Sequence, residues 1–296
     1  MVRLTTTTSP LAYTAPATTE TMTDDGGAFS FSTIAGGDWR VQPLKLGDTA
    51  AAITALDAVY VLQAAAGLRS LTPNQQMACD VSGNGTVTAM DAVLILQYKV
   101  GLLANLPVAQ ACGSDWTFIP DPTDTSSNQQ LMAPETAPDG CHTGAIAFEP
   151  LLADADGQDF LALVIGDCSG SWQPAGKLGA LHVGANGSDA VRLGRPRVVR
   201  GKLRVPLMVT TSGTFRALDA QIGFDANRLT ATGVHLLGDA QGALLAENHS
   251  LPGSVRISLA SGTPLHSGSV LMLEFDVDTV PPALRSLQVL RASVQQ

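Results

Sequence analysis

The chain has 296 residues, enough for two or three domains, and a formal net charge of −9 at neutral pH. This charge argues against a nucleic-acid partner, because no basic surface is available to displace the counterions of a phosphate backbone. No stretch approaches the roughly 20 apolar residues that a membrane-spanning helix needs. Charged residues make up only 15% of a glycine-rich sequence, which is typical of β-rich modules with many turns.

Residues 1–42 begin with a Thr-rich stretch that predicts a linker or a residual strand. Residues 26–31 and 38–41 carry alternating aromatic and apolar side chains, which predicts the last two strands of a partial β-sandwich. The pattern resembles the end of a transthyretin-like or carboxypeptidase-regulatory-like surface repeat. Residues 1–8 lack the apolar stretch of a signal peptide, and we expect the chain to be a fragment of a longer protein.

Residues 80–91 predict a calcium loop that leads into a helix. Ca²⁺ takes roughly six to eight oxygen ligands, and alternate residues of a tight loop can supply them. Gly85 stands sixth, where the chain of such a loop must turn sharply. The predicted ligands stand first, third, fifth, seventh (through its carbonyl), ninth and twelfth, and are Asp80, Ser82, Asn84, Thr86, Thr88 and Asp91. The alternative is a polar turn that caps the helix without a metal.

The second half of this block occurs twice, since residues 53–59 repeat as residues 87–93. Each copy predicts a helix with an apolar stripe, ended by Gly67 in one copy and by Gly101 in the other. Neither helix can bury its stripe alone, so we expect the two helices to pack on each other. The first copy has fewer oxygen-bearing side chains, and its weaker candidate ligands are Asp48, Thr54 and Asp57.

Both copies end in the pattern D-A-V-x-x-L-Q-x-x-x-G, and residues 43–104 resemble the type I dockerin module. The resemblance implies two EF-hand-like loop–helix repeats, bound Ca²⁺ and a cohesin-like domain as partner. In dockerins the residues just before the closing Asp often help to recognise cohesin. The matching residues are apolar, which fits either a partner-binding surface or burial within this chain, the second being favoured: Ala55, Leu56, Ala89 and Met90.

Residues 105–176 predict a β segment around a loop closed by cysteines. Cys112 and Cys141 flank a stretch rich in Pro, Asp and Ser, and we expect a disulfide between them, which suits an oxidising compartment. Cys79 and Cys168 could either pair or remain buried thiols. The cysteine spacing does not fit a zinc site.

Residues 167–172 echo the beginning of the 80–91 loop. Asp167, Ser169 and Ser171 could form a partial calcium site, and the alternative is a polar turn. We favour the polar turn, because a Gly at the sixth place and a closing carboxylate are both missing from this segment.

Residues 177–194 predict a linker, and residues 195–296 predict a C-terminal β-sandwich or jelly roll. Apolar alternation marks its strands at 203–209, 217–222, 254–259 and 270–275. Residues 217–234 resemble the cohesin and carbohydrate-binding jelly-roll pattern A-x-x-x-x-x-x-Y-D-P-x-x-L-x-x-x-G-V, in which the 225–229 turn is structural. The expected fold class is therefore mixed and mainly β, with a small α module between β segments.

No nucleophile elbow, HExxH motif, P-loop or dinucleotide fingerprint is present in the sequence. We therefore expect a non-catalytic protein, at most an accessory part of a glycoside-hydrolase system.

Two functions remain open. The first is an extracellular or cell-surface scaffold or adhesion protein, in which the dockerin-like module assembles with a cohesin-like domain of its own or of another chain. The alternative is an accessory carbohydrate-binding component of a polysaccharide-degrading complex. Residues 191–296 contain no Trp or Tyr, which weakens direct polysaccharide binding.

Overall fold

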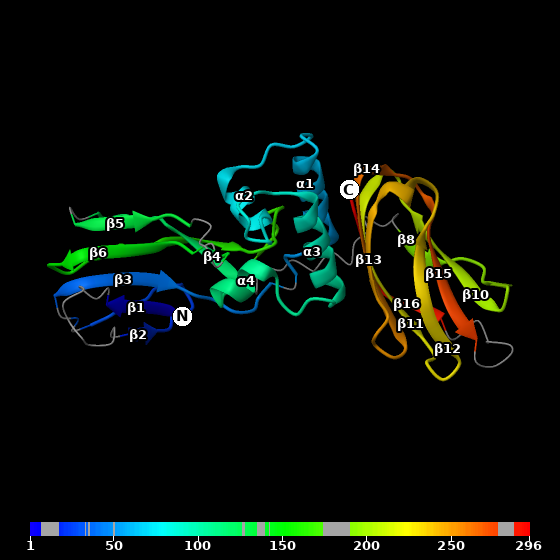
Figure 1. Cartoon of the computed structure of the whole chain (residues 1–296), viewed down its shortest axis with the longest axis horizontal. Helices are drawn as coiled ribbons and strands as arrows, with labels where there is room; N and C mark the ends of the chain where they lie inside the picture. Colours follow the sequence, from blue (N-terminus) through cyan, green and yellow to red (C-terminus); the bar gives the residue numbers. More distant parts are fainter. Residues whose placement is uncertain are drawn as a thin grey trace. The chain divides into compact units, whose positions relative to one another are not determined.

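The computed structural model describes residues 1–6, 18–32, 34, 36–49, 51–125, 128–134, 140–141, 143–173, 190–277 and 287–296. The chain divides into two compact units, and each includes part of the predicted calcium module (Figure 1). The first unit comprises Met1–Ala50, Thr72–Thr86 and Asn105–Gly166, and the second comprises Ala51–Leu71, Val87–Ala104 and Asp167–Gln296. Most of the expected linker at 177–194 lies outside the described residues.

An antiparallel five-stranded sheet organises the first unit, in the order β2-β1-β3-β6-β5. Its strands are β1 (Val2–Thr6), β2 (Thr18–Thr21), β3 (Gly37–Pro43), β5 (Gln129–Met132) and β6 (Ala145–Leu151). Alternate side chains of β1, β3 and β6 point into one core, which contains Val2, Leu4, Trp39, Val41, Ile146 and Phe148. The boundary expected at residue 42 therefore separates strands that share one sheet, because β3 pairs with β6 from beyond the calcium module.

The strand expected at 26–31 is a turn followed by irregular chain. Asp24 Oδ1 accepts the backbone N–H groups of Gly26 at 2.8 Å and Ala28 at 2.9 Å, and these bonds close the chain on itself. Phe29 and Phe31 still pack on the core of the sheet, with their rings edge to face at 6.2 Å. The apolar alternation was correct as a sign of packing and wrong as a sign of a strand.

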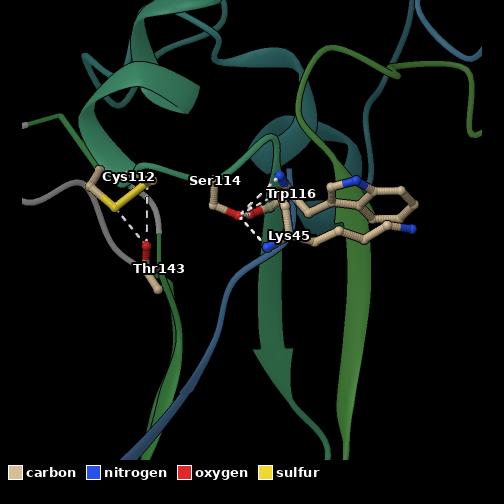
Figure 2. The surroundings of a disulfide bond; sticks show 6 residues. Lys45, Cys112, Ser114, Trp116 and Thr143 are labelled. Carbon is tan, nitrogen blue, oxygen red and sulfur yellow. Dashed lines mark hydrogen bonds between the residues drawn. A yellow bond between two sulfur atoms is a disulfide. The ribbon is translucent and has the colours of Figure 1, made fainter. Parts of the chain in front are cut away.

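A second, two-stranded sheet in the first unit pairs β4 (Trp116–Pro120) with β7 (Phe160–Val164). The unit also contains the short helices α2 (Pro73–Cys79) and α4 (Pro107–Cys112). The structure links Cys112 to Cys141 by a disulfide, and the Thr143 hydroxyl contacts both sulfur atoms (Figure 2). Cys79 and Cys168 are each completely buried and disulfide-bonded.

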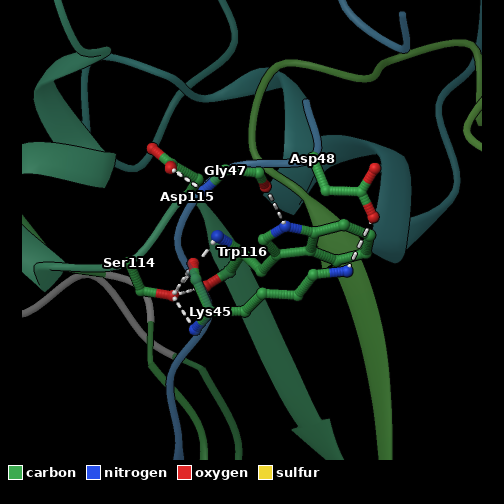
Figure 3. A network of polar contacts seen from close by, with 6 residues as sticks. All are labelled: Lys45, Gly47, Asp48, Ser114, Asp115 and Trp116. Atoms are coloured by element: carbon green, nitrogen blue, oxygen red, sulfur yellow. Dashed lines mark hydrogen bonds and ion pairs between the residues drawn. The ribbon is translucent and has the colours of Figure 1, made fainter. Parts of the chain in front are cut away.

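A polar network joins the chain that follows β3 to the chain that precedes β4 (Figure 3). The buried Ser114 hydroxyl oxygen accepts the backbone N–H groups of Lys45 and Trp116, and its single hydrogen is within reach of both of their carbonyl oxygens, at 3.2 Å and 2.7 Å. The Trp116 indole donates to the Gly47 carbonyl at 3.0 Å, while the Lys45 ammonium lies 3.8 Å from the centre of the indole ring. This network fixes the chain that leads into the first repeat.

The second unit contains a β-sandwich and two helices, α1 (Ala55–Ala65) and α3 (Ala89–Val100). One sheet has the order β12-β15-β10-β8, with β9 paired to β10, and the other has the order β13-β14-β11-β16. The strands are β8 (Ala190–Leu193), β9 (Arg197–Val199), β10 (Lys202–Thr210), β11 (Phe215–Phe224), β12 (Leu229–Leu236), β13 (Leu244–Asn248), β14 (Ser254–Leu265), β15 (Gly268–Val277) and β16 (Leu287–Gln295). A 3₁₀ turn (Gly238–Gly242) precedes β13.

Apolar side chains from both sheets share one core in this sandwich, and Phe215 and Phe275 are completely buried in it. Leu229 enters the same core from the 225–229 turn, as its sequence pattern predicts. Helix α1 packs against α3, and α3 ends at Gly101, whose φ of +80° allows the chain to turn away. The expected fold class, mainly β with a small helical module, is confirmed. No helix in the described ranges is long and apolar enough to cross a membrane.

Candidate metal centre and helix contacts

The predicted calcium loop begins at Asp80, and a ring of donors surrounds its carboxylate. Asp80 Oδ1 accepts the Ser82 hydroxyl at 3.1 Å and the Asn84 N–H at 3.2 Å, and Oδ2 accepts the Gly85 N–H at 2.7 Å. Asn84 Oδ1 in turn accepts the N–H and the hydroxyl of Thr86. The first half of the loop thus curls around one carboxylate and brings its oxygen-bearing side chains together.

Two glycines allow this curl. Gly83 and Gly85 both have positive φ angles, +76° and +85°, which side chains rarely adopt. A Cβ at Gly83 would also clash with the carbonyl oxygen of Gly140.

The predicted loop ends at the start of α3, in the second unit. Asp91 is completely buried, and its Oδ2 accepts both the N–H of Thr88 at 2.8 Å and the Thr88 hydroxyl at 3.1 Å. This is a capping box, which fixes the direction of the Asp91 carboxylate before any ligand binds.

The first repeat ends in the same way. Asp57 Oδ2 accepts the N–H of Thr54 at 2.7 Å and the Thr54 hydroxyl at 2.9 Å, and Asp57 is also completely buried. Burial and, second to it, the neighbouring negative charge of Asp167 together raise the pKa of the Asp57 carboxyl to about 7. Asp48 lies in the first unit, where its carboxylate pairs with the Lys45 ammonium at 2.9 Å.

The candidate ligands of residues 80–91 suit a hard cation. No three Asp, Glu, His or Cys side chains gather into a cluster within the described ranges. The donors are instead mixed: residues 80–86 offer carboxylate, amide and hydroxyl oxygens, and Thr88 and Asp91 offer a hydroxyl and a carboxylate. Oxygen donors of this kind are those that Ca²⁺ takes in proteins, so the donor set fits the predicted metal.

The sandwich contacts the N-terminus of α1 through a carboxylate that sequence analysis did not single out. Asp219 on β11 accepts the backbone N–H of Ala55 at 3.1 Å through Oδ2 and the Ser258 hydroxyl at 2.6 Å through Oδ1. The first N–H groups of a helix have no partner within the helix, and its dipole favours a negative charge at this end. Asp219 of the sandwich therefore satisfies a backbone group at the N-terminus of α1.

Asn248 on β13 meets the other helix at its C-terminal end. Its Nδ2 donates to the Val100 carbonyl at 3.0 Å, and the Asn248 side chain is buried. At Gly101, a Cβ would lie 3.0 Å from Nη1 of Arg256 on β14, so the helix end and the sheet approach closely. No sequence motif pointed to these residues, because polar side chains on a strand are ordinarily exposed to solvent.

The four apolar residues predicted as partner contacts or as buried positions differ between the two repeats. Ala55 is completely buried and Leu56 is half-buried. Ala89 and Met90, at the equivalent places of the second repeat, are exposed, with 58% of Met90 accessible to solvent. The structure thus buries the first pair and leaves the second pair open.

Comparison with known proteins agrees with the resemblance of the helical module. Residues 50–98 match the model of the dockerin type I domain. No curated protein matches the chain.

Several solved structures similar to part of the chain are cohesin modules. One is a cohesin module from a family 33 glycoside hydrolase of Clostridium perfringens, at 13% identity and a TM-score of 0.30, covering 36% of this chain and 81% of that one. Another is a non-cellulosomal cohesin from Archaeoglobus fulgidus, at 15% identity and a TM-score of 0.29, covering 36% of this chain and 77% of that one. A third is the sixth cohesin of Acetivibrio cellulolyticus scaffoldin B in complex with a Cel5 dockerin, at 15% identity and a TM-score of 0.29, covering 37% and 82%.

Proposed function

We propose that this chain is a non-catalytic, extracellular assembly protein in which a calcium-dependent dockerin module pairs with the chain's own cohesin-like sandwich. The observation that carries the proposal is the contact of α1 and α3 with β11, β13 and β14 inside one compact unit. Each helix presents an end with unsatisfied backbone groups, and a polar side chain of the sandwich satisfies it.

The sheet β13-β14-β11-β16 has an outward face whose side chains allow helices to pack closely against it. Leu218, Ile222 and Ile257 point inward to the sandwich core, so the residues that alternate with them point outward. The outward residues include small or polar side chains that are nevertheless buried: Ala246, Asn248, Ser258 and Ala260. Small side chains let helices approach a sheet, and burial of Asn248 and Ser258 is tolerated because both are hydrogen-bonded.

Calcium contributes by fixing the loops from which the paired helices start. An ion that binds only the folded loop stabilises it by mass action, and it would hold the first turn of α3 in its helical form. The Cys112–Cys141 disulfide supports a location outside the cell, where oxidising conditions and free Ca²⁺ coexist.

The test reverses the charge at the N-terminus of α1. In the full chain with Ca²⁺, Asp219→Lys places a cation against the positive end of the helix dipole, and we expect amide hydrogen exchange in α1 to accelerate at least tenfold. Asp276→Lys, an exposed position on β15 of the other sheet, is the matched control and should leave α1 unchanged. Equal exchange of α1 in wild type and Asp219→Lys would show that the sandwich does not hold this helix.

A further inference from the structure

We propose that the first dockerin repeat has a calcium site assembled from two separate segments, residues 52–57 and residues 167–171. The second segment supplies the start of the loop that the first repeat lacks. Asp57 and Ser169, which meet in this site, are 112 residues apart in the sequence. The inference goes beyond the proposed pairing, because the site could bind calcium whether or not the sandwich holds the helices.

The 167–172 turn shares three side-chain hydrogen bonds with the 80–85 turn. Asp167 Oδ1 accepts the hydroxyl of Ser169 at 3.1 Å and the N–H of Ser171 at 2.8 Å, and Oδ2 accepts the N–H of Trp172 at 2.8 Å. Asp80 receives the corresponding three donors from the residues two, four and five places later. The glycine at the fourth place is also shared, and Gly170 has a φ of +68°. The turn is therefore the first half of a calcium loop in shape as well as in sequence.

Residues 54–57 match the second half of the 80–91 loop to the same degree. The Asp57 carboxylate accepts the N–H and hydroxyl of Thr54, as the Asp91 carboxylate accepts those of Thr88. The two halves that are continuous in the second repeat are thus both present for the first repeat, in different parts of the chain.

The structure brings these halves together in the register of a complete loop. The N–H of Ser169 donates to Asp57 Oδ1 at 2.8 Å, and the Ser171 hydroxyl donates to the Ala52 carbonyl at 3.1 Å. Counted back from Asp57 as the twelfth place, Ala52 is the seventh, whose backbone carbonyl binds calcium in a loop of this type. Asp167, Ser169 and Ser171 then occupy the first, third and fifth places.

Because the proposed loop consists of two separate segments, residue 172 does not need to be glycine. In a continuous loop the sixth residue turns the chain toward the seventh, and Gly85 does so with a φ of +85°. Trp172 has no such task, because the seventh ligand comes from Ala52 on a different segment. Of the two features whose absence favoured a polar turn, the glycine is unnecessary and the closing carboxylate is Asp57.

Charge gives an independent reason for a cation here. Asp57 and Asp167 are 0% and 6% exposed, and neither forms an ion pair with Lys, Arg or His in the described part of the chain. Two neighbouring buried carboxylates are costly unless a positive charge neutralises them. A divalent cation between them removes the repulsion and uses the hydroxyl and carbonyl oxygens as further ligands.

The expected site is one of modest affinity. Two carboxylates, two hydroxyls, one carbonyl and the ninth-place Thr54, directly or through water, give about six or seven oxygens, within the range that Ca²⁺ accepts. Ser171 is exposed, which provides an entry path for the ion and for a water ligand. With only two carboxylates, we expect a dissociation constant on the order of 10⁻⁴–10⁻³ M, as in extracellular modules.

Calcium stoichiometry of the full chain tests the site. Equilibrium dialysis should give two calcium ions per wild-type chain and one per Asp167→Asn chain, since the amide keeps the size of the side chain and loses its charge. Asp159→Asn, an exposed carboxylate just upstream, is the matched control and should keep two. One ion in the wild type, or two ions in Asp167→Asn, would overturn the proposal.

A second measurement locates the ion and does not depend on how well Asp167→Asn folds. Terbium(III), a hard cation that replaces calcium, should show luminescence sensitised by Trp172, because this indole follows the ligands directly. Trp172→Phe should lower that emission while calcium stoichiometry stays at two, and Ser171→Ala should weaken terbium binding at least tenfold. Unchanged emission in Trp172→Phe and unchanged affinity in Ser171→Ala would contradict a site at this turn.

Discussion

Asn248 Nδ2 donates a 3.0 Å hydrogen bond to the carbonyl of Val100, so a buried side chain of the sandwich satisfies the last residue of α3. Asn248 also accepts the N–H and hydroxyl of Ser250 through Oδ1, which fixes the orientation of its amide. The helical module and the sandwich are therefore joined by hydrogen bonds made inside a buried contact, where such bonds affect stability most.

Asn248→Ala should lower the free energy of unfolding of the second unit by about 1–3 kcal/mol, because the Val100 carbonyl loses its partner in a buried place. Urea denaturation in Ca²⁺ measures the change. Asn227→Ala, in the exposed turn after β11, should change the stability by less than about 0.5 kcal/mol. Equal effects of the two variants would mean that the hydrogen bond of Asn248 does not contribute to the free energy of unfolding.

Calcium should stabilise the chain through the 80–91 loop. An ion at 100 times its dissociation constant adds about 2.7 kcal/mol for each site that binds only the folded state. The double variant Asp80→Ala Asp91→Ala should lose the part of the calcium-dependent rise in melting temperature that this loop provides. If the wild-type chain melts at the same temperature in Ca²⁺ and in EDTA, the hypothesis that residues 80–91 bind calcium is wrong.

Stability without calcium should depend on pH through Asp57. The pKa of its carboxyl is about 7 in the folded chain against an ordinary 3.8, with burial as the main cause and the charge of Asp167 as the second. The folded state therefore keeps a proton that the unfolded state releases, and the free energy of unfolding falls by a few kcal/mol as the pH rises from about 4 to about 7. Asp57→Asn should remove this slope.

Thermal melts of wild type and Asp57→Asn in calcium-free buffer, at several pH values between 4 and 8, measure the effect. Taking the difference between the two proteins cancels other titrating groups, such as Glu274, whose pKa burial raises but Arg204 and His235 together lower below its ordinary value. Parallel pH profiles would show that Asp57 titrates alike in the folded and unfolded chain.

The disulfide should stabilise the first unit. Cys112 and Cys141 are 29 residues apart, and a link over this distance restricts the unfolded chain by about 3–4 kcal/mol. Cys112→Ser Cys141→Ser should unfold at a correspondingly lower denaturant concentration in the absence of reductant. A variant as stable as the wild type would mean that the link does not restrict the unfolded chain.

Local patterns in the sequence predict much of this fold. The repeat with its closing Asp residues and apolar stripes predicts α1 and α3. Alternation predicts β10, β11, β14 and β15, because one face of each strand enters a core. These features need only residues that are near one another in the chain.

What the sequence does not show depends on long-range contacts. Strands β3 and β6 pair although the whole calcium module lies between them in the sequence. The hydrogen bond between Asp219 and Ala55 joins residues that are 164 apart. The turn at Asp167 has no closing carboxylate in its own segment, and we propose that Asp57 of the first repeat supplies it from 110 residues earlier in the chain. A motif of consecutive residues cannot reveal a metal site whose ligands come from two distant segments of the chain.

Energy transfer within single chains tests the pairing most directly. Fluorophores at Leu102→Cys and Leu251→Cys, exposed positions beside the Val100–Asn248 contact, can be attached because the native cysteines are disulfide-bonded. We expect high transfer in Ca²⁺ that persists when a tenfold excess of unlabelled chain is added, and a clear loss of transfer in EDTA. Low transfer in Ca²⁺, or transfer that is the same with and without the ion, would contradict calcium-dependent pairing of the dockerin module with its own sandwich.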